Sequence, residues 1–335
     1  MRIPPKSIGI AAALVTISIW TSFIVIARAS AALSLNPMDI VFLRFIGAAL
    51  VLLPWGWWLV RRQRRHPPAG LAAPQGDSFF GLSPLPLRTT VMVGSVGGLI
   101  YSVLAYSGFF FAPAAHASVL LPGSLPMWTA LLTILVLHER IPGARMFGLG
   151  LILLGGLLVG GRSLLEAFAG ADAWKGDLFF LSAAFCWASY AVMARRFQLD
   201  AVRATIAVSV FSIIVYLPGY LLAVASGLLP SRLLSAPLGE VLFQTAFQGI
   251  ASVAIAGITF TTMVRHFGPV RSTMMTAVVP GLSALAAALF LGEPLGWNLV
   301  LGLALVTLGM LFGLRAAAAA PLAPGAKGSL PQAAG

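Results

Sequence analysis

Few ionisable side chains lie inside the apolar segments of this sequence, and Arg44 is the one basic residue placed well within such a segment. A guanidinium at that depth is costly unless it is paired or faces water. Asp39, five positions earlier, is one candidate partner, although a spacing of four would bring the two side chains together better on a helix. Two interpretations stay open: a structural arginine tied to carbonyls and Asp39, or an arginine that holds a substrate carboxylate or phosphate.

A stripe of polar residues further along the chain also indicates a functional surface. Gln244, Gln248, Ser252 and Thr259 are spaced by four, four and seven, so one face of a helix carries all of them. Because lipid would penalise that face, it should look into the protein, either bonding neighbouring helices or lining an aqueous cavity. Tyr101 aligns with this face through the internal repeat described below, and we expect it to point inward as well.

Aromatic residues supply the remaining candidates for a binding site. Trp20 lies in "WTSF" and Trp187 in the similar "WASY", and both are too deep for the aromatic belt of a membrane interface. A buried Trp needs a partner for its N–H, which a facing helix or a ligand could supply. Tyr190 follows Trp187 by three residues and is a weaker candidate, and Ser102 and Tyr106 rank lower on a flank beside Tyr101.

Catalytic and cofactor chemistry is not indicated. No acid lies near the centre of an apolar segment, no GxSxG or GxxxxGK[ST] motif occurs, and the four histidines are scattered without metal-ligand spacing. His116 is expected to be a solvated residue at a helix end. Cys186 is the only cysteine, so an intrachain disulfide is impossible. We therefore expect no enzyme activity, no cofactor and no metal.

The elements that position these residues follow from composition. Of the 335 residues 59% are hydrophobic and only 9% are charged, which is typical of a membrane protein. Runs of about 20 apolar residues without alternation predict membrane-spanning helices and not a barrel. We predict an all-α bundle of ten transmembrane helices, at 8–27, 37–60, 89–111, 115–137, 145–161, 177–194, 204–226, 240–264, 270–291 and 296–314.

The basic residues indicate how these helices are oriented. If alternate loops are assigned to opposite sides, sixteen of the 21 Lys and Arg residues fall on the side of the two termini. The positive-inside rule then predicts that both termini are cytoplasmic. We expect a bacterial-type inner membrane, which fits the absence of an organelle address in the sequence. The net charge of +12 is thus a topology signal, and we expect a lipid environment and no nucleic-acid partner. A homodimer is possible but not required.

An internal duplication divides the chain into two units. A shift of 154 positions brings Pro126 onto Pro280 and Glu139 onto Glu293, together with many flanking residues. Each unit has five helices, and since five is odd, the second must cross the membrane the other way up. We expect a first repeat over 1–161 with a mobile loop at 62–87, an inverted second repeat over 175–315, and a disordered tail over 316–335.

The duplicated acids end one apolar segment and precede the next. Glu139 and Glu293 are expected to cap the helix that follows each of them, since a helix N terminus favours a carboxylate. Together with Pro126 and Pro280 they would fix the geometry of a turn at each membrane face. Gating or ion coupling by these acids is the alternative.

These features resemble the drug/metabolite transporter superfamily, in particular its ten-helix EamA-type members. The resemblance rests on Trp20, Pro37, Arg44, Pro126, Glu139, Trp187, Pro280 and Glu293 in their order along the chain. It implies a permease for small organic metabolites, often an exporter, with cytoplasmic termini and a cavity between the halves.

We therefore expect a secondary transporter that works by alternating access around a midplane cavity. The candidate substrate-binding residues are Arg44, Trp20, Tyr101, Trp187, Tyr190, Gln244, Gln248 and Ser252. The first helix lacks the buried Glu with which small multidrug exporters related to the superfamily exchange protons for cationic drugs. A buried Arg without a central carboxylate favours an anionic or zwitterionic substrate, such as an amino acid. An exporter of cationic drugs is the alternative, and a channel or scaffold is a remote one.

Overall fold

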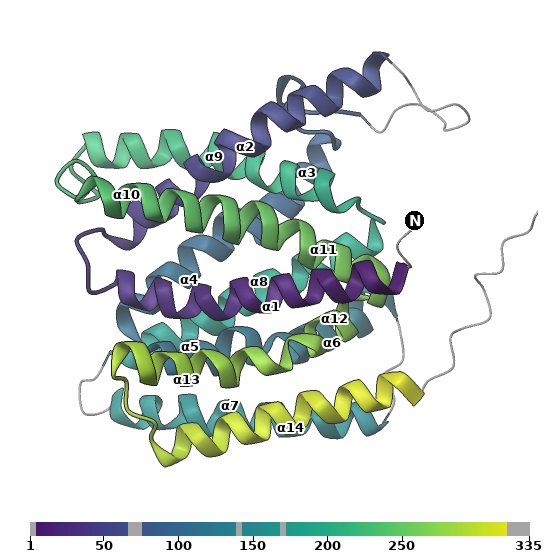
Figure 1. The fold of residues 1–335 in the computed structure, drawn as a ribbon, viewed down its shortest axis with the longest axis vertical. Coiled ribbons are helices and arrows are strands. Elements are labelled where there is room, and N and C mark those ends of the chain that lie inside the picture. Colours follow the sequence, from purple (N-terminus) through teal and green to yellow (C-terminus); the bar gives the residue numbers. More distant parts are fainter. Residues whose placement is uncertain (1–4, 66–75, 139–142, 168–171, 320–335) are drawn as a thin grey trace, which may run out of the picture.

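The protein folds into a bundle of long helices. The computed structural model describes residues 5–65, 76–138, 143–167 and 172–319 (Figure 1). Within these residues eight helical runs are long and apolar enough to cross a membrane, and Met146–Val159 and Trp297–Gly313 are shorter apolar stretches, which gives the expected ten. The α-helices are α1 (Pro5–Ser30), α2 (Pro37–Arg65), α3 (Leu87–Gly94), α4 (Ile100–Phe111), α5 (Ala114–Ser118), α6 (Leu125–Leu137), α7 (Gly143–Ala167), α8 (Ala173–Arg196), α9 (Ala201–Ala225), α10 (Leu238–Gln244), α11 (Ala256–Phe267), α12 (Pro269–Met275), α13 (Val279–Leu291) and α14 (Trp297–Ala319).

Four of the ten crossings are not single regular helices. The third and eighth contain π-helical turns, η2 (Ser95–Leu99) and η4 (Thr245–Ile255), which join α3 to α4 and α10 to α11. The fourth contains a π-helical turn with Pro122 in it, η3 (Val119–Gly123), and the ninth a 3₁₀ turn, η5 (Thr276–Val278). The π turns of the third and eighth crossings carry residues that surround Arg44, as is common for such turns at functional sites.

The duplication seen in the sequence is a duplication of structure. The bounds of α6 and α13 coincide after the shift of 154, with Pro126 and Pro280 in their first turns. Both helices end at a residue in the left-handed region, His138 with φ 54° and Gly292 with φ 66°. Proline suits a first turn because its missing N–H has no partner there in any helix.

Helices α7 and α14 lie side by side along one edge of the bundle and pack through glycines (Figure 1). A Cβ on Gly148 would lie 2.4 Å from the carbonyl oxygen of Gly309, and one on Gly155 would lie 2.6 Å from that of Gly302. The shift of 154 positions relates Gly148 to Gly302 and Gly155 to Gly309. The contact of Gly148 with Gly309 is therefore the symmetry equivalent of the contact of Gly302 with Gly155. This is the packing of an antiparallel pair of equivalent helices.

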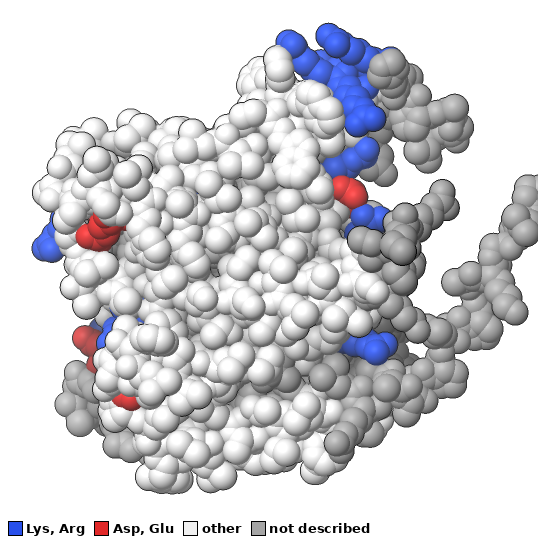
Figure 2. Space-filling view, in the orientation of Figure 1, with Lys and Arg blue, Asp and Glu red and all other residues white. Residues whose placement is uncertain are grey.

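The two ends of the bundle differ in charge. The last turns of α2 and α8 carry Arg62, Arg64, Arg65, Arg195 and Arg196 and lie at one end, the basic end, where α1 also begins. Most of the visible Lys and Arg side chains gather at this end (Figure 2). Asp39, Asp177, Glu240 and Glu293 define the acidic end. Helix α1 therefore runs from the basic to the acidic end and α8 runs back, so the repeats are inverted.

Much of the loop expected at 62–87 is folded. Helix α2 continues to Arg65, and Arg64 pairs with Asp77. Ser78 and Ser83 bridge through their backbones, and Leu85 is 2% exposed. Residues 66–75 and most of the expected tail, residues 320–335, lie outside the described residues.

Candidate functional site

Arg44 is held between the two repeats by a close approach of backbones. A Cβ on Gly249 in η4 would lie 2.5 Å from Cα of Gly47 in α2, so only glycine allows this contact. One turn before Gly47, the Arg44 side chain is 4% exposed, and its Nη1 donates to Ser252 Oγ at 2.9 Å and to the Tyr106 hydroxyl at 3.4 Å. The Arg44 guanidinium of α2 therefore contacts the polar face of the eighth crossing, to which Ser252 belongs.

Asp39 is not the partner of Arg44. Its Oδ1 accepts from the Tyr220 hydroxyl at 2.5 Å and from Ser231 Oγ at 2.9 Å, and its Oδ2 accepts from the backbone N–H groups of Asn36 and Arg232 at 3.1 and 3.0 Å. These four donors satisfy the carboxylate at the acidic end. Among the described residues no carboxylate lies within ion-pair distance of Arg44.

The glutamines predicted to face inward form a chain of hydrogen bonds. The Tyr106 hydroxyl donates to Gln248 Oε1 at 2.5 Å, Gln248 Nε2 donates to Gln244 Oε1 at 3.1 Å, and Gln244 Nε2 donates to Ser30 Oγ at 2.6 Å. In each of these bonds the donor lies on the side nearer to Arg44 and the acceptor on the far side. The positive charge of Arg44 favours this direction of the hydrogen bonds. Neither glutamine lines either of the cavities beside Arg44 described below. They thus connect helices, whereas Ser252 borders both cavities.

Aromatic residues line a cavity of about 30 Å³ on one side of Arg44, here called the aromatic cavity. Trp20, Phe23, Tyr101 and Trp187 contribute to its wall, with Leu121 and Ser252. Trp187 lies 4.9 Å from Tyr101 and 6.0 Å from Trp20, measured between ring centroids. The predicted equivalence of Trp20 and Trp187 is thus matched by their contact across the interface of the two repeats.

A second cavity of about 20 Å³ lies beside the aromatic cavity and is here called the hydroxyl cavity. Its wall includes Arg44, Trp187 and Ser252, which both cavities share, and the side chains of Ser102, Thr205, Ser209, Ser212 and Tyr190. The Tyr190 hydroxyl is bonded to Thr261 Oγ1 at 2.6 Å and is already satisfied. Sequence reasoning did not single out Ser209 and Ser212. The signal was present, because the polar residues of α9 recur at intervals of four, three, four and four, at Thr205, Ser209, Ser212, Tyr216 and Tyr220, which places them on one face of the helix.

Glu293 forms a latch between the repeats at the acidic end. Its Oε1 accepts from Arg28 Nε at 3.0 Å and from the N–H of Ala114 at 3.2 Å, and its Oε2 accepts from the N–H of Ala115 at 3.2 Å. The helix N terminus that it contacts is that of α5, in the other repeat, and not that of α14, which follows it in the chain. Glu139 lies outside the described residues.

His116 is not the solvated residue that the sequence suggested. Its Nδ1 lies 2.9 Å from Asp177 Oδ1, and the two side chains are 18% and 5% exposed. The pair joins α5 of the first repeat to α8 of the second at the acidic end.

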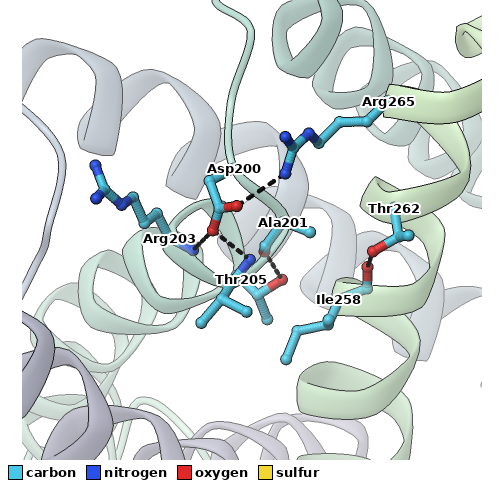
Figure 3. Close-up of polar contacts among 8 residues, drawn as sticks. Asp200, Ala201, Arg203, Thr205, Ile258, Thr262 and Arg265 are labelled. Atoms are coloured by element: carbon cyan, nitrogen blue, oxygen red, sulfur yellow. Dashed lines mark hydrogen bonds and ion pairs between the residues drawn. The ribbon is translucent and has the colours of Figure 1, made fainter. Parts of the chain in front are cut away.

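A different kind of contact occurs at the basic end. Asp200 Oδ1 accepts from the N–H groups of Val202 and Arg203 at 3.1 and 3.2 Å and so caps α9, while Arg265 Nη1 donates to Oδ2 at 2.8 Å. Figure 3 shows this carboxylate between Arg265 and the first turn of α9. Both partners belong to the second repeat.

Comparison with known proteins bears on what this arrangement does. The sequence profile of the EamA-like transporter family matches residues 7–161 and again residues 174–315. The chain belongs to this family. The EamA match covers both repeats, and the protein is therefore a multi-pass membrane transporter of the drug/metabolite transporter superfamily.

Two curated relatives are similar to this EamA chain. One is the uncharacterized transporter YyaM of Bacillus subtilis (strain 168), 23% identical over 69% of this chain and 75% of that protein. Another is an uncharacterized transporter of Archaeoglobus fulgidus, 27% identical over 49% of this chain and 50% of that protein. A solved crystal structure matches with a TM-score of 0.59 at 21% identity, over 93% of this chain and 98% of that one, and supports the fold.

Proposed function

We propose that the protein is a secondary transporter that exports small organic molecules bearing a carboxylate, such as amino acids, by alternating access. The observation that carries the proposal is the Arg44 guanidinium, which is buried between the repeats at a cavity and has no carboxylate in contact among the described residues. An uncompensated charge inside a membrane protein is costly. A bound anion offsets that cost, whereas a cation adds to it.

The two cavities suit different parts of such a substrate. The hydroxyl cavity offers hydrogen-bond donors for a carboxylate, and the aromatic cavity offers ring faces for an apolar side chain. Their combined room suffices for only a few water molecules, since one water needs about 10–15 Å³. The repeats must therefore move apart to admit a substrate, as alternating access requires.

Export of cationic compounds is the second candidate. The rings of Trp20, Tyr101, Trp187 and Phe260 favour it, because an aromatic wall attracts a cation. The guanidinium carbon of Arg44, however, lies 5.8 Å from the centre of the Phe23 ring and 6.0 Å from that of the Tyr101 ring. A protein cation already occupies part of the aromatic surface.

The orientation belongs to the same proposal. The basic end is assigned to the cytoplasm by the positive-inside rule, with both termini there and the chain in the plasma membrane. Reporter fusions to the loops 31–36 and 197–200, which lie at opposite ends, would test this assignment.

The deciding experiment is uptake and counterflow of labelled amino acids, organic anions and a cationic dye by purified protein in liposomes, with and without a pH gradient. Arg44→Ala should abolish transport of carboxylates, and Arg44→Lys should retain part of it. Arg88→Ala removes an exposed arginine at the basic end and is the matched control. Transport of the dye alone, unchanged in the Arg44 variants, would favour the second candidate.

A further inference from the structure

The hydroxyl cavity is surrounded by hydrogen-bond donors that no protein group uses. Among the described residues, Oγ of Ser102, Ser209 and Ser212, Nε1 of Trp187 and Nε of Arg44 have no hydrogen-bond partner. All five side chains line this one cavity. They are deeply buried, with exposed fractions of 0%, 2%, 0%, 9% and 4% in the same order.

Unpartnered hydroxyls are unusual inside a helix. A buried Ser or Thr ordinarily returns its proton to the carbonyl four residues earlier, as Thr205 in α9 does to Ala201 at 2.9 Å. Ser209 and Ser212 lie in the same helix and do not. A buried donor left unpaired loses the hydrogen bond that it made in water, so several such donors around one space indicate a ligand that they share.

The donors also define the charge of that ligand. Indole and guanidinium N–H groups can only donate, and a serine hydroxyl can donate to an acceptor. The site thus disfavours a cation, because Trp187 Nε1 and Arg44 Nε offer it no lone pair and the Arg44 charge repels it. An anion is favoured for two reasons: each of the five groups can donate to it, and its charge neutralises the buried guanidinium.

Gly98 in η2 keeps the space open. A Cβ at this position would lie 2.2 Å from Ser212 Oγ and 2.8 Å from Val208 Cγ1, so any other residue would fill the cavity from the side of the serines. The volume of about 20 Å³ exceeds the 10–15 Å³ that one water needs, and it suits one compact monovalent group.

From these observations we propose that the hydroxyl cavity is a binding site for one monovalent anion, either a free halide or the carboxylate of a transported molecule. A halide would be a resident or co-transported ion. A carboxylate would reach the site from the aromatic cavity, with which it shares Arg44, Trp187 and Ser252. Only this second source rests on the proposed function.

The test is ligand binding by the purified full-length protein in detergent, without transport. Its unfolding midpoint is followed while bromide or acetate replaces sulfate at constant ionic strength, because a ligand of the native state raises the midpoint with its concentration. The wild type should respond to at least one of the two anions. The double variant Ser209→Ala, Ser212→Ala should bind that anion at least tenfold more weakly, since each change removes a hydrogen bond to a charged group. Gly98→Ala should abolish the response.

Ser189→Ala is the matched control. Ser189 is a half-buried residue of α8 that lines neither cavity, and its hydroxyl donates to Phe185 O, so this variant should respond as the wild type does. A response to bromide alone identifies an ion site, and a response to acetate alone identifies the head-group site of a substrate. The proposal is overturned if the wild type responds to neither anion or if the double variant responds as the wild type does. Failure of carboxylate transport in liposomes with bromide binding intact would count against the proposed function only.

Discussion

Removing the charge of Glu293 should loosen the acidic end of the transporter. The substitution Glu293→Gln keeps the size of the side chain and an amide oxygen that can still accept one N–H. It removes the ion pair with Arg28 and weakens the contact with the first turn of α5. Because these bonds join the turn before α14 to α1 and α5, they cross between the repeats, and separation of the repeats at this end must break them.

The size of the effect follows from the exposure of the pair. Arg28 is 33% and Glu293 13% exposed, so solvent screens the ion pair and its contribution is at most about 1 kcal/mol. A carboxylate at a helix N terminus adds about 0.3–1 kcal/mol. A loss of about 1–2 kcal/mol shifts the equilibrium toward the state open at the acidic end by roughly 5-fold to 30-fold.

Thiol accessibility of the aromatic cavity measures that shift. Leu121 lines the cavity and is replaced by Cys in a Cys186→Ala background, and a membrane-impermeant thiol reagent is added from the acidic end in vesicles of known sidedness. Glu293→Gln should raise the rate of modification by the factor given above. Asp172→Asn removes the same charge at the same end, where the carboxylate is 62% exposed and pairs with Lys175 one turn away, and should leave the rate unchanged. Equal rates in the wild type and Glu293→Gln, or equal acceleration by Asp172→Asn, would refute the latch.

Two further substitutions test the packing that places the site. Gly155→Ala should lower the unfolding midpoint in detergent, because its Cβ would lie 2.6 Å from Gly302 O and overpacking of this kind costs about 1–3 kcal/mol. Gly150→Ala is the control on the same helix: no atom lies within 4 Å of the new Cβ, and the midpoint should not fall. Tyr106→Phe should destabilise the protein by about 1–3 kcal/mol, since it leaves Gln248 Oε1 without its donor, and an unchanged midpoint would show that the hydrogen-bond chain is not a structural element.

Sequence reasoning was most reliable where lipid constrains the residue type. A polar side chain in an apolar segment must face inward, so the amino-acid sequence alone places Arg44, Gln248 and Ser252 on the inner face, where all three are buried. The duplication likewise predicted equivalent helices, because proline and glycine mark turns by backbone geometry. Periodicity did not distinguish Gln248, which serves a hydrogen-bond chain, from Ser252, which borders both cavities.

Other features depend on contacts between segments far apart in the chain. Glu293 and the α14 that follows it are neighbours in sequence, yet the N–H groups that Glu293 contacts belong to α5, because inversion brings the two repeats together at that end. The polar spacing of α9 could have placed Ser209 and Ser212 on an inward face, but it does not show that their hydroxyls lack a partner, since a serine in a helix usually bonds to a carbonyl of its own helix. Within the π-helical turns, Gly98 approaches Ser212 and Gly249 approaches Gly47, and one sequence does not record such contacts between distant segments.

The polar contacts at the two ends predict which end opens first. At the acidic end the Arg28–Glu293 and His116–Asp177 pairs and the bonds from Tyr220 and Ser231 to Asp39 each join one repeat to the other. At the basic end, the ion pairs between described residues, Arg64 with Asp77 and Arg265 with Asp200, each lie within one repeat. One polar contact does join the repeats there, because the Gln63 amide oxygen, in the orientation that satisfies it, accepts from Arg203, so the basic end has fewer such contacts than the acidic end. Contacts within a repeat survive its rotation as a body, whereas contacts between repeats must break. The repeats should therefore part more readily at the basic end. With Glu293 and its contacts unaltered, a cysteine at Leu121 should be modified faster by the thiol reagent added from the basic end than from the acidic end. Under the proposed orientation, in which the basic end faces the cytoplasm, this is the order of steps that the proposed export requires.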